Sequence, residues 1–427
     1  MSDRHKNIAY PSQLIRLRNI SLSGGPYVLL LYAVPAGIAG ALTTMGFRAA
    51  LDSLLIMILG HTGDMAMLAA QTAAITRLVV PTCGGLVAGL LLLFSQRYAQ
   101  KVDHPEYMEA ITIGNGRLPV RHTLIRSLAS LSSIATGASI GREGPMVQLA
   151  ATASSLIGRI AHISVERTRT LVASGAAAAL SAAYGAPFAS AFFVAEVVLG
   201  NTSAQRMGPI IVAAVVSNVT VRSLSDFEPL YALSALPSIS ATQFLFFPII
   251  GLLLGILAPL FLASLRISKR TWAKFTIGHR WSLPLRLAMA GLMVGLISIW
   301  LPQVWGNGYG PVLELTKGDW ATSMIAAILV FKILATVISS GAGAIGGVFT
   351  PTLFIGAALG ALSAKLFALI LPTLAPPPLI FIIVGMGLPR CHCASPIDRH
   401  SDSFRDDVKL SGHGPVDVVR NGFFLCQ

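Results

Sequence analysis

The sequence predicts an all-α protein that crosses a membrane several times. Hydrophobic residues make up 54% of its 427 residues and charged residues only 11%, and the mean hydropathy is +0.71. Soluble domains do not reach such values, because about a quarter of their residues are charged. Many of the apolar stretches are short or interrupted by Gly and Pro. Such interruption in both halves of a chain is typical of transporters whose discontinuous helices surround a site near the middle of the membrane.

The distribution of charge also indicates a membrane protein. The formal net charge is +13, but Lys and Arg stand at the ends of apolar runs, as Arg97, Arg159 and Lys269 do. This pattern sets membrane topology, and it argues against a nucleic-acid partner. Residues 1–26 come before the first span, and their beginning is polar and basic with no apolar core of a signal peptide. We therefore expect them to form a cytoplasmic N-terminal segment.

The apolar stretches define the expected spans. The segment from Tyr27 to Arg48 is long enough to cross a bilayer, whereas Leu51 to Leu59 is too short to cross on its own. A run of small residues from Ala173 to Ala183 leads to a helix that carries Glu196, and small residues at this density indicate the interior of a helix bundle. The other expected helices are 78–95, 124–140, 146–160, 208–222, 243–266, 284–301, 321–340 and 347–371.

The stretch from Ser139 to Pro145 places Arg142 and Glu143 inside an otherwise apolar region. A charge at bilayer depth costs several kcal/mol and is retained where it faces protein, water or an ion pathway. Gly141 and Gly144 should end one helix, and Pro145 fits the first turn of the next, expected from Met146 to Ile160. The start of a helix presents unpaired N–H groups and the positive end of its dipole. The sequence therefore predicts an anion site here, with Glu143 as the first functional candidate.

A related stretch occurs in the second half of the chain. Gly347-Val-Phe-Thr-Pro351 has the same length and the same end residues as Gly141-Arg-Glu-Gly-Pro145. Each stretch precedes an apolar helix with a cation near its end, Arg159 in the first case and Lys365, on the helix expected from Thr352 to Phe367, in the second. This internal symmetry predicts two helix N-termini that converge on one anion from two halves of the protein.

These motifs resemble those of the CLC chloride channels and proton/chloride exchangers, closest to the bacterial ClcB-type branch. The resemblance rests on Gly141–Pro145, on Gly346–Pro351 and on Ala186-Pro187 followed by Glu196, and it extends from about residue 27 to Gly387. It implies an inverted-repeat fold with broken and tilted helices, whose transmembrane domain spans 27–387. The first repeat would span about 27–222 and the second about 243–387, incomplete because the last helices are missing. It further implies a homodimer in the bacterial inner membrane.

The resemblance also assigns roles to residues. Glu143 would be the gate, and Gly141, Arg142 and Gly144 around it would belong to the chloride-binding region. The backbone amides of Val348 and Phe349 would hold the central chloride. Chloride is the transported ion in this family, so we expect no cofactor.

The sequence departs from the family pattern at three places. Val102, within Lys101–Pro105, stands where the family has a chloride-contacting serine, and Val197 follows Glu196 where exchangers carry a second glutamate as internal proton acceptor. The chloride-contacting tyrosine of the family has no counterpart. We therefore expect a chloride channel of the voltage-gated type, with a proton/chloride antiporter or a non-transporting product as alternatives. Glu196 is either an internal proton site or a structural carboxylate.

Simpler interpretations remain open for each motif. Glu143 and Arg142 can form a structural ion pair, the neighbouring glycines can serve packing alone, and Glu196 can be a charge at a helix end. Cys391-His392-Cys393 does not match a zinc-site spacing. The sequence contains no hydrolase or phosphate-loop motif, so we expect neither an enzyme nor an ATP-driven pump.

The chain changes character after Gly387. Residues 388–427 are polar and charged, and such a segment can neither span nor pack in lipid. Codons exist for Ile397 to Asp407 that, read one base later, encode an apolar helix ending in glutamate. We therefore expect a frameshift that removes the closing spans, with a polar tail after a domain linker as the alternative.

Overall fold

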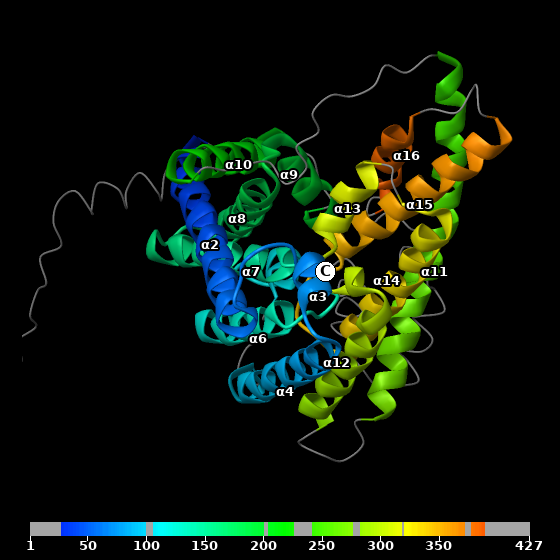
Figure 1. The fold of residues 1–427 in the computed structure, drawn as a ribbon. Coiled ribbons are helices and arrows are strands. Elements are labelled where there is room, and N and C mark those ends of the chain that lie inside the picture. Colours follow the sequence, from blue (N-terminus) through cyan, green and yellow to red (C-terminus); the bar gives the residue numbers. More distant parts are fainter. Residues whose placement is uncertain are drawn as a thin grey trace, which may run out of the picture. The chain divides into compact units, whose positions relative to one another are not determined.

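The computed structural model describes residues 27–99, 106–199, 204–225, 241–275, 282–317, 320–371 and 377–388. Helices account for all regular structure in these residues, and Figure 1 follows them in chain order. A π-helical turn, Val194–Val198, and two 3-10 turns, Ala241–Phe246 and Pro302–Val304, complete the elements. The helices are α2 (Tyr27–Leu59), α3 (Met65–Gln71), α4 (Ala74–Ala99), α5 (Tyr107–Thr112), α6 (Val120–Ala135), α7 (Glu143–Ile160), α8 (Val165–Tyr184), α9 (Pro187–Phe193), α10 (Ala204–Leu224), α11 (Phe247–Lys274), α12 (Ser282–Trp300), α13 (Tyr309–Thr316), α14 (Thr322–Ala342), α15 (Phe349–Ile370) and α16 (Pro378–Gly385).

Among the described residues, 7 helical segments are long and apolar enough to cross a membrane, in α2, α4, α10, α11, α12, α14 and α15. The predicted all-α membrane fold is thus confirmed. The expected end of the first span at Arg48 is wrong, because Leu51–Leu59 continues α2 as one helix of 33 residues. No glycine or proline stands between Gly46 and Gly60 to end it. At 1.5 Å per residue this helix is about 50 Å long, more than the hydrocarbon core of a bilayer.

The described chain forms two compact units that alternate along the sequence. Its first unit contains the described residues of 27–44, 106–119 and 147–225, and α8 packs against α9 and α10 within it. Small residues let the neighbouring helices approach α8 closely, as the sequence predicted for this run. Gly40 of α2 lies against Ala178, where any side chain at position 40 would overlap it. Two serine hydroxyls join α8 to α10: Ser181 Oγ donates to Ala214 O (2.6 Å) and Ser217 Oγ donates to Ala178 O (2.7 Å).

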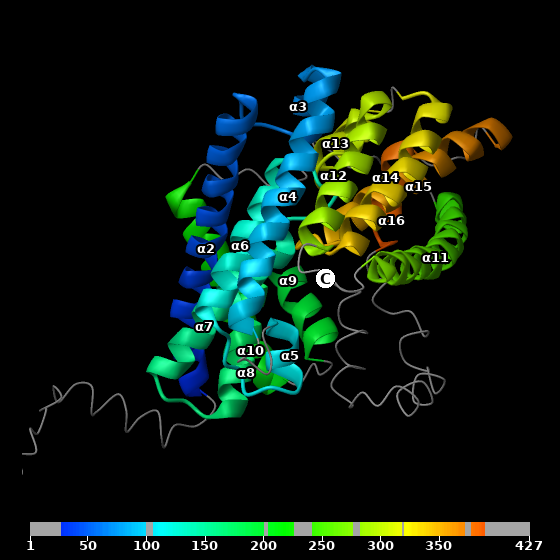
Figure 2. The same ribbon diagram turned by 90° about the horizontal axis from the view of Figure 1, so that it is seen from below.

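The second unit contains the described residues of 45–99, 120–146 and 241–388. Its helices α4 and α12 lie side by side in both views (Figures 1 and 2). Glycines allow this contact: Gly85 lies against Leu287 O, and Gly291 against Pro81 O, so that a β-carbon at either glycine would overlap a carbonyl oxygen. The backbones therefore approach without intervening side chains, which is how membrane helices gain packing energy.

A second close pair, α15 and α16, lies in the same unit. Gly356 and Gly385 face each other so closely that a β-carbon on either would overlap the carbonyl of the other. Around this contact, α11, α15 and α16 bury an apolar cluster that includes Phe261, Ile355 and Phe381. This cluster holds α15, the helix that follows the second glycine stretch, in a packed position.

Both predicted helix breaks are present, although the helices start earlier than expected. The α7 helix begins at Glu143 rather than Met146, and α15 begins at Phe349 rather than Thr352. Pro145 and Pro351 tolerate this start because a helix does not use the N–H groups of its first turn. The division into repeats at about 27–222 and 243–387 stays a prediction. Residues 389–427, and the frameshift expected there, lie outside the described residues.

Candidate functional site

The two glycine stretches meet within the second unit. Gly141 N donates a hydrogen bond to Gly347 O (2.6 Å), and Gly347 N donates one to Gly141 O (2.9 Å). This antiparallel pair needs residues without side chains. A β-carbon on Gly144 would lie 3.1 Å from Gly347 N, and one on Gly346 would lie 2.9 Å from Gly141 O. The sequence identified both stretches, but the direct backbone pairing between them is a finding of the structure.

Glu143 lies at this pair as the first residue of α7. Its side chain is only 5% exposed, and its Oε2 lies directly against the α-carbon of Gly141, where any side chain at position 141 would overlap it. Oε2 has no hydrogen-bond partner, and Glu143 forms no ion pair with Arg142 or another cation among the described residues. The ion-pair interpretation of Glu143 thus finds no contact to support it. A buried carboxylate without a counter-charge is costly, and in membrane proteins such a group marks a functional site.

The starts of two helices follow directly after the Gly141–Gly347 pair. The α7 helix begins at Glu143, and α15 begins at Phe349 with Val348 as its N-cap residue. Val348 is buried, and its carbonyl accepts the first helical hydrogen bond from Thr352 N (2.9 Å). Each helix start carries a partial positive charge and N–H groups that the helix itself does not pair. Together they suit a small anion, and the Glu143 carboxylate is itself such a group.

Of the other predicted residues, Arg142 is next to Glu143, whereas Glu196 belongs to the other unit. Arg142 is half-buried on the turn before α7. Glu196 is exposed on the π-helical turn Val194–Val198, and the half-buried Val197 follows it. Glu196 and Val197 belong to the first unit, whereas Arg142 and Glu143 belong to the second. A π-helical turn is frequently found at functional sites. Lys101–Pro105 and Cys391–Cys393 lie outside the described residues.

Sequence reasoning missed a buried lysine. Lys332 lies in the middle of α14 and is fully buried. It stands alone in a long apolar run, which is the signal that could have drawn attention to it. The sequence placed Ser139 at the start of the Ser139–Pro145 stretch but gave it no role; its hydroxyl lies 3.0 Å from Thr336 Oγ1 of α14. The partner of neither residue is evident from local sequence.

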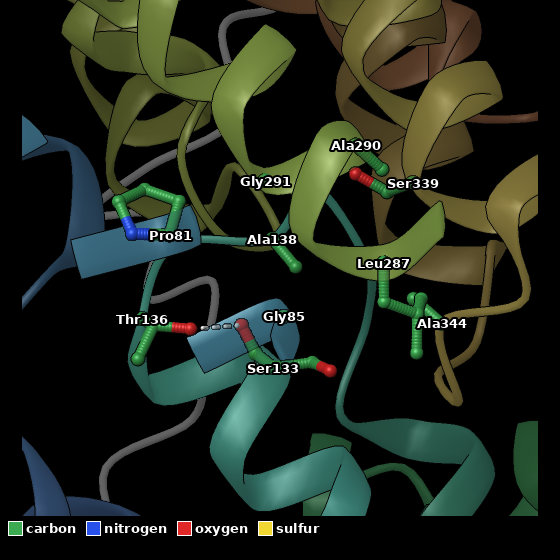
Figure 3. A pocket seen from close by; sticks show the side chains of 10 residues that line it. All are labelled: Pro81, Gly85, Ser133, Thr136, Ala138, Leu287, Ala290, Gly291, Ser339 and Ala344. Atoms are coloured by element: carbon green, nitrogen blue, oxygen red, sulfur yellow. Dashed lines mark hydrogen bonds between the residues drawn. The ribbon is translucent and has the colours of Figure 1, made fainter. Parts of the chain in front are cut away.

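A small cavity lies near this turn, among α4, α6, α12 and α14 (Figure 3). Its polar side chains are the hydroxyls of Ser133, Thr136 and Ser339, and no charged residue lines it. The Thr136 hydroxyl donates a hydrogen bond to Ser133 O (3.2 Å), which is the dashed line in Figure 3. About 20 Å³ of the cavity is open to the centre of a water molecule, which is room for one. The cavity does not contain Glu143, so the anion site described above is distinct from it.

Comparison with known proteins identifies the family. The family model described as "Voltage gated chloride channel" matches residues 84–388, more than half of the chain. The chain belongs to this family. The resemblance drawn from its glycine motifs is confirmed.

Relatives of this voltage-gated chloride channel family are similar over most of their length. A putative chloride channel protein, ClcB-like, from Ralstonia nicotianae is 43% identical over 355 residues, which cover 82% of each chain. The ClC-type chloride channel ClcB of Salmonella typhimurium is 38% identical over 347 residues, covering 80% of this chain and 82% of the relative. These identities support the predicted bacterial ClcB-type branch.

Solved structures confirm the fold. A slow cyanobacterial Cl⁻/H⁺ antiporter superposes with a TM-score of 0.71 at 22% identity, covering 85% of this chain and 87% of the other. A CLC-type fluoride/proton antiporter superposes with a TM-score of 0.67 at 20% identity, covering 90% and 87%. The protein is thus a multi-pass membrane protein with the CLC fold.

Proposed function

We propose that this protein conducts chloride across the bacterial inner membrane as a homodimer, with Glu143 as its gate. The observation that carries the proposal is the buried, unpaired carboxylate of Glu143 beside the Gly141–Gly347 pair. Membership of the voltage-gated chloride channel family supports chloride as the ion. The relatives named as ClcB chloride channels support the same choice.

The mechanism follows from charge. A carboxylate and a chloride ion carry the same charge, so they compete for the partial positive charge at the helix starts. Ionised Glu143 occupies the anion position and blocks it, and a proton or an incoming chloride releases the block. Gly141 leaves room for the carboxylate, Gly144 lets the turn approach Gly347, and the amides of Val348 and Phe349 bind the ion. Binding is weak and spread over more than one position, because conduction requires release as well as entry.

Proton coupling is expected to be weak. Val197 cannot accept a proton, and it stands where exchangers of this family carry their second glutamate. Proton/chloride exchange is the second candidate function. It is favoured by the exposed carboxylate of Glu196 on the π-helical turn, since a carboxylate can take up and release a proton. The two candidates differ in whether protons move in a fixed ratio to chloride.

Flux measurements separate these functions. The purified full-length protein is reconstituted into vesicles with a chloride gradient and an opposing proton gradient, and the reversal potential is measured. A channel reverses at the chloride equilibrium potential whatever the proton gradient. A reversal potential that follows both gradients in a fixed ratio would establish exchange instead. Chloride release no faster than from protein-free vesicles would mean that this chain does not transport.

A further inference from the structure

We propose that Lys332 is a positioning residue for the Glu143 gate, acting through a polar stripe on α14 that holds the turn before α7. The polar stripe consists of Lys332, Thr336 and Ser339. This inference rests on the proposed gating role of Glu143. It adds a residue that touches neither chloride nor the Glu143 carboxylate.

The polar stripe occupies one face of a membrane-spanning helix. Residues 332, 336 and 339 follow the spacing i, i+4, i+7, so their side chains share one side of α14. All of them are at most 2% exposed. Polar groups buried in a membrane helix are retained where they find partners. Thr336 and Ser339 find their partner in the turn between Ala135, the end of α6, and Glu143, whereas Lys332 finds its partners in a second segment.

Two members of the stripe bind the turn directly. Ser139 N donates a hydrogen bond to Ser339 Oγ (3.2 Å), and the hydroxyls of Ser139 and Thr336 lie 3.0 Å apart. Ser139 is fully buried and stands just before Ile140 and Gly141 in the chain. These bonds fix the residues that lead into the Gly141–Gly347 pair.

Lys332 acts on the same turn through a second segment. Its ammonium donates to Val304 O (3.0 Å) and Gly306 O (2.7 Å), and it faces the ring of Phe354 with 5.4 Å to the ring centre. Three partners of this kind satisfy a charge that burial would otherwise make very costly. Lys332 therefore fixes the backbone on both sides of Trp305.

Trp305 transmits this constraint to the turn. Its side chain is fully buried, and its indole lies against Gly137, where a β-carbon would stand only 2.6 Å from the ring. Gly137 has φ of 100°, a conformation that favours glycine. Gly306 N also points to Gly137 O at 3.5 Å, a long contact. The segment around Trp305, which Lys332 holds, therefore packs on Gly137 at the start of the turn. The same turn ends at Glu143.

Asp64 fixes the far end of this segment. Its carboxylate accepts from Ala66 N (2.9 Å) at the start of α3 and from Gly310 N (2.9 Å) in α13. Position 310 must be glycine, because a β-carbon there would overlap the Asp64 carboxylate. The segment from Val304 to Gly310 is held at one end by Lys332 and at the other by Asp64. Removing the ammonium releases the end that carries Trp305.

The test compares Lys332→Met, which keeps much of the side-chain volume but removes the charge, with wild type in reconstituted vesicles. We expect the ratio of chloride flux at low pH to flux at high pH to fall by roughly tenfold, the effect expected from the loss of a charge-assisted hydrogen bond. In the Glu143→Gln background the same substitution should leave the pH profile unchanged. Lys274→Met, at an exposed lysine of α11, is the matched control and should behave as wild type.

A milder variant keeps the test valid if Lys332→Met does not fold. Thr336→Val retains the shape of the side chain and removes only the hydroxyl that meets Ser139, so its flux ratio should fall by less. The positioning role would be overturned if Lys332→Met lowered the flux but kept the wild-type pH profile. If Lys332→Met does not fold, the same result in Thr336→Val would overturn it. It would leave Lys332 as a packing residue.

A second readout does not depend on transport. The emission of Trp305 is obtained as the difference between spectra with and without Trp305→Phe, and we expect a red shift in Lys332→Met as the indole leaves Gly137. If the wild-type protein shows no chloride flux but Lys332→Met shows this red shift, the gating proposal is rejected. The contact between Lys332 and the turn is then still supported. An unchanged Trp305 emission in a folded Lys332→Met protein would reject the inference itself.

Discussion

Substitution of Gly141 by alanine tests whether the two glycine stretches really meet. A β-carbon at position 141 would lie 2.9 Å from Gly347 O and would overlap Glu143 Oε2. The Glu143 side chain can turn aside, but Gly347 O is a backbone atom that accepts the hydrogen bond from Gly141 N and cannot give way without losing that bond. The backbone pair must therefore open.

The magnitude follows from what is lost. Two backbone hydrogen bonds join Gly141 and Gly347, and each contributes about 1 kcal/mol net. Overpacking of a close contact costs a further 1 to 3 kcal/mol or so. Because the chain relaxes in part, we expect Gly141→Ala to lower the free energy of unfolding by about 2 to 4 kcal/mol. An apparent melting temperature lower by roughly 5 °C corresponds to this loss.

Thermal unfolding in detergent measures this effect, with Gly251→Ala as the matched control. Gly251 lies on α11 with open space around its α-carbon, so alanine there should stabilise the helix by up to about 1 kcal/mol. The two substitutions are predicted to shift the melting temperature in opposite directions. If Gly141→Ala melts at the wild-type temperature, the close pairing of the two stretches is wrong.

Three further outcomes follow from the structure. Phe349→Pro, at the first residue of α15, removes one amide donor and should weaken chloride binding roughly 10- to 100-fold in titration calorimetry, whereas Val102→Ser should retain it; equal affinity in the two variants would count against the amide site. Gly360→Val should abolish the folded protein in size-exclusion chromatography, because its side chain would overlap Phe381 O; a monodisperse, wild-type-like peak would contradict the α15–α16 contact. Ser217→Ala should destabilise the α8–α10 contact by about 1 kcal/mol in thermal unfolding, and no change there would mean that the hydroxyl bond contributes nothing.

The sequence predicted those features that depend on local chemistry. Gly141, Gly144 and Pro145 indicated a helix break at membrane depth, and a break is present. The start of the helix was placed at Met146 instead of Glu143, because proline is compatible with more than one position in a first turn. The difference matters, since it makes Glu143 part of the helix start rather than of the loop before it.

Contacts between distant segments were beyond sequence reasoning. Hydrophobic periodicity assigns faces to helices, but it does not say which residue meets which across the bundle. Nothing in the local sequence connects Trp305 to Gly137, or Lys332 to the carbonyls on either side of Trp305. Lys332 could have been noticed as a lone charge in an apolar span. Its partners, which give the charge its role, appear only once the chain is folded.

The central claim is that the carboxylate of Glu143 competes with chloride for one position. The measurement that tests it most directly is chloride flux through vesicles as a function of pH, for wild type and for Glu143→Gln. Wild-type flux should fall as the pH rises, because the ionised carboxylate occupies the anion position. Glutamine carries no charge, so flux through Glu143→Gln should be nearly independent of pH. The same pH dependence in both proteins would contradict the account.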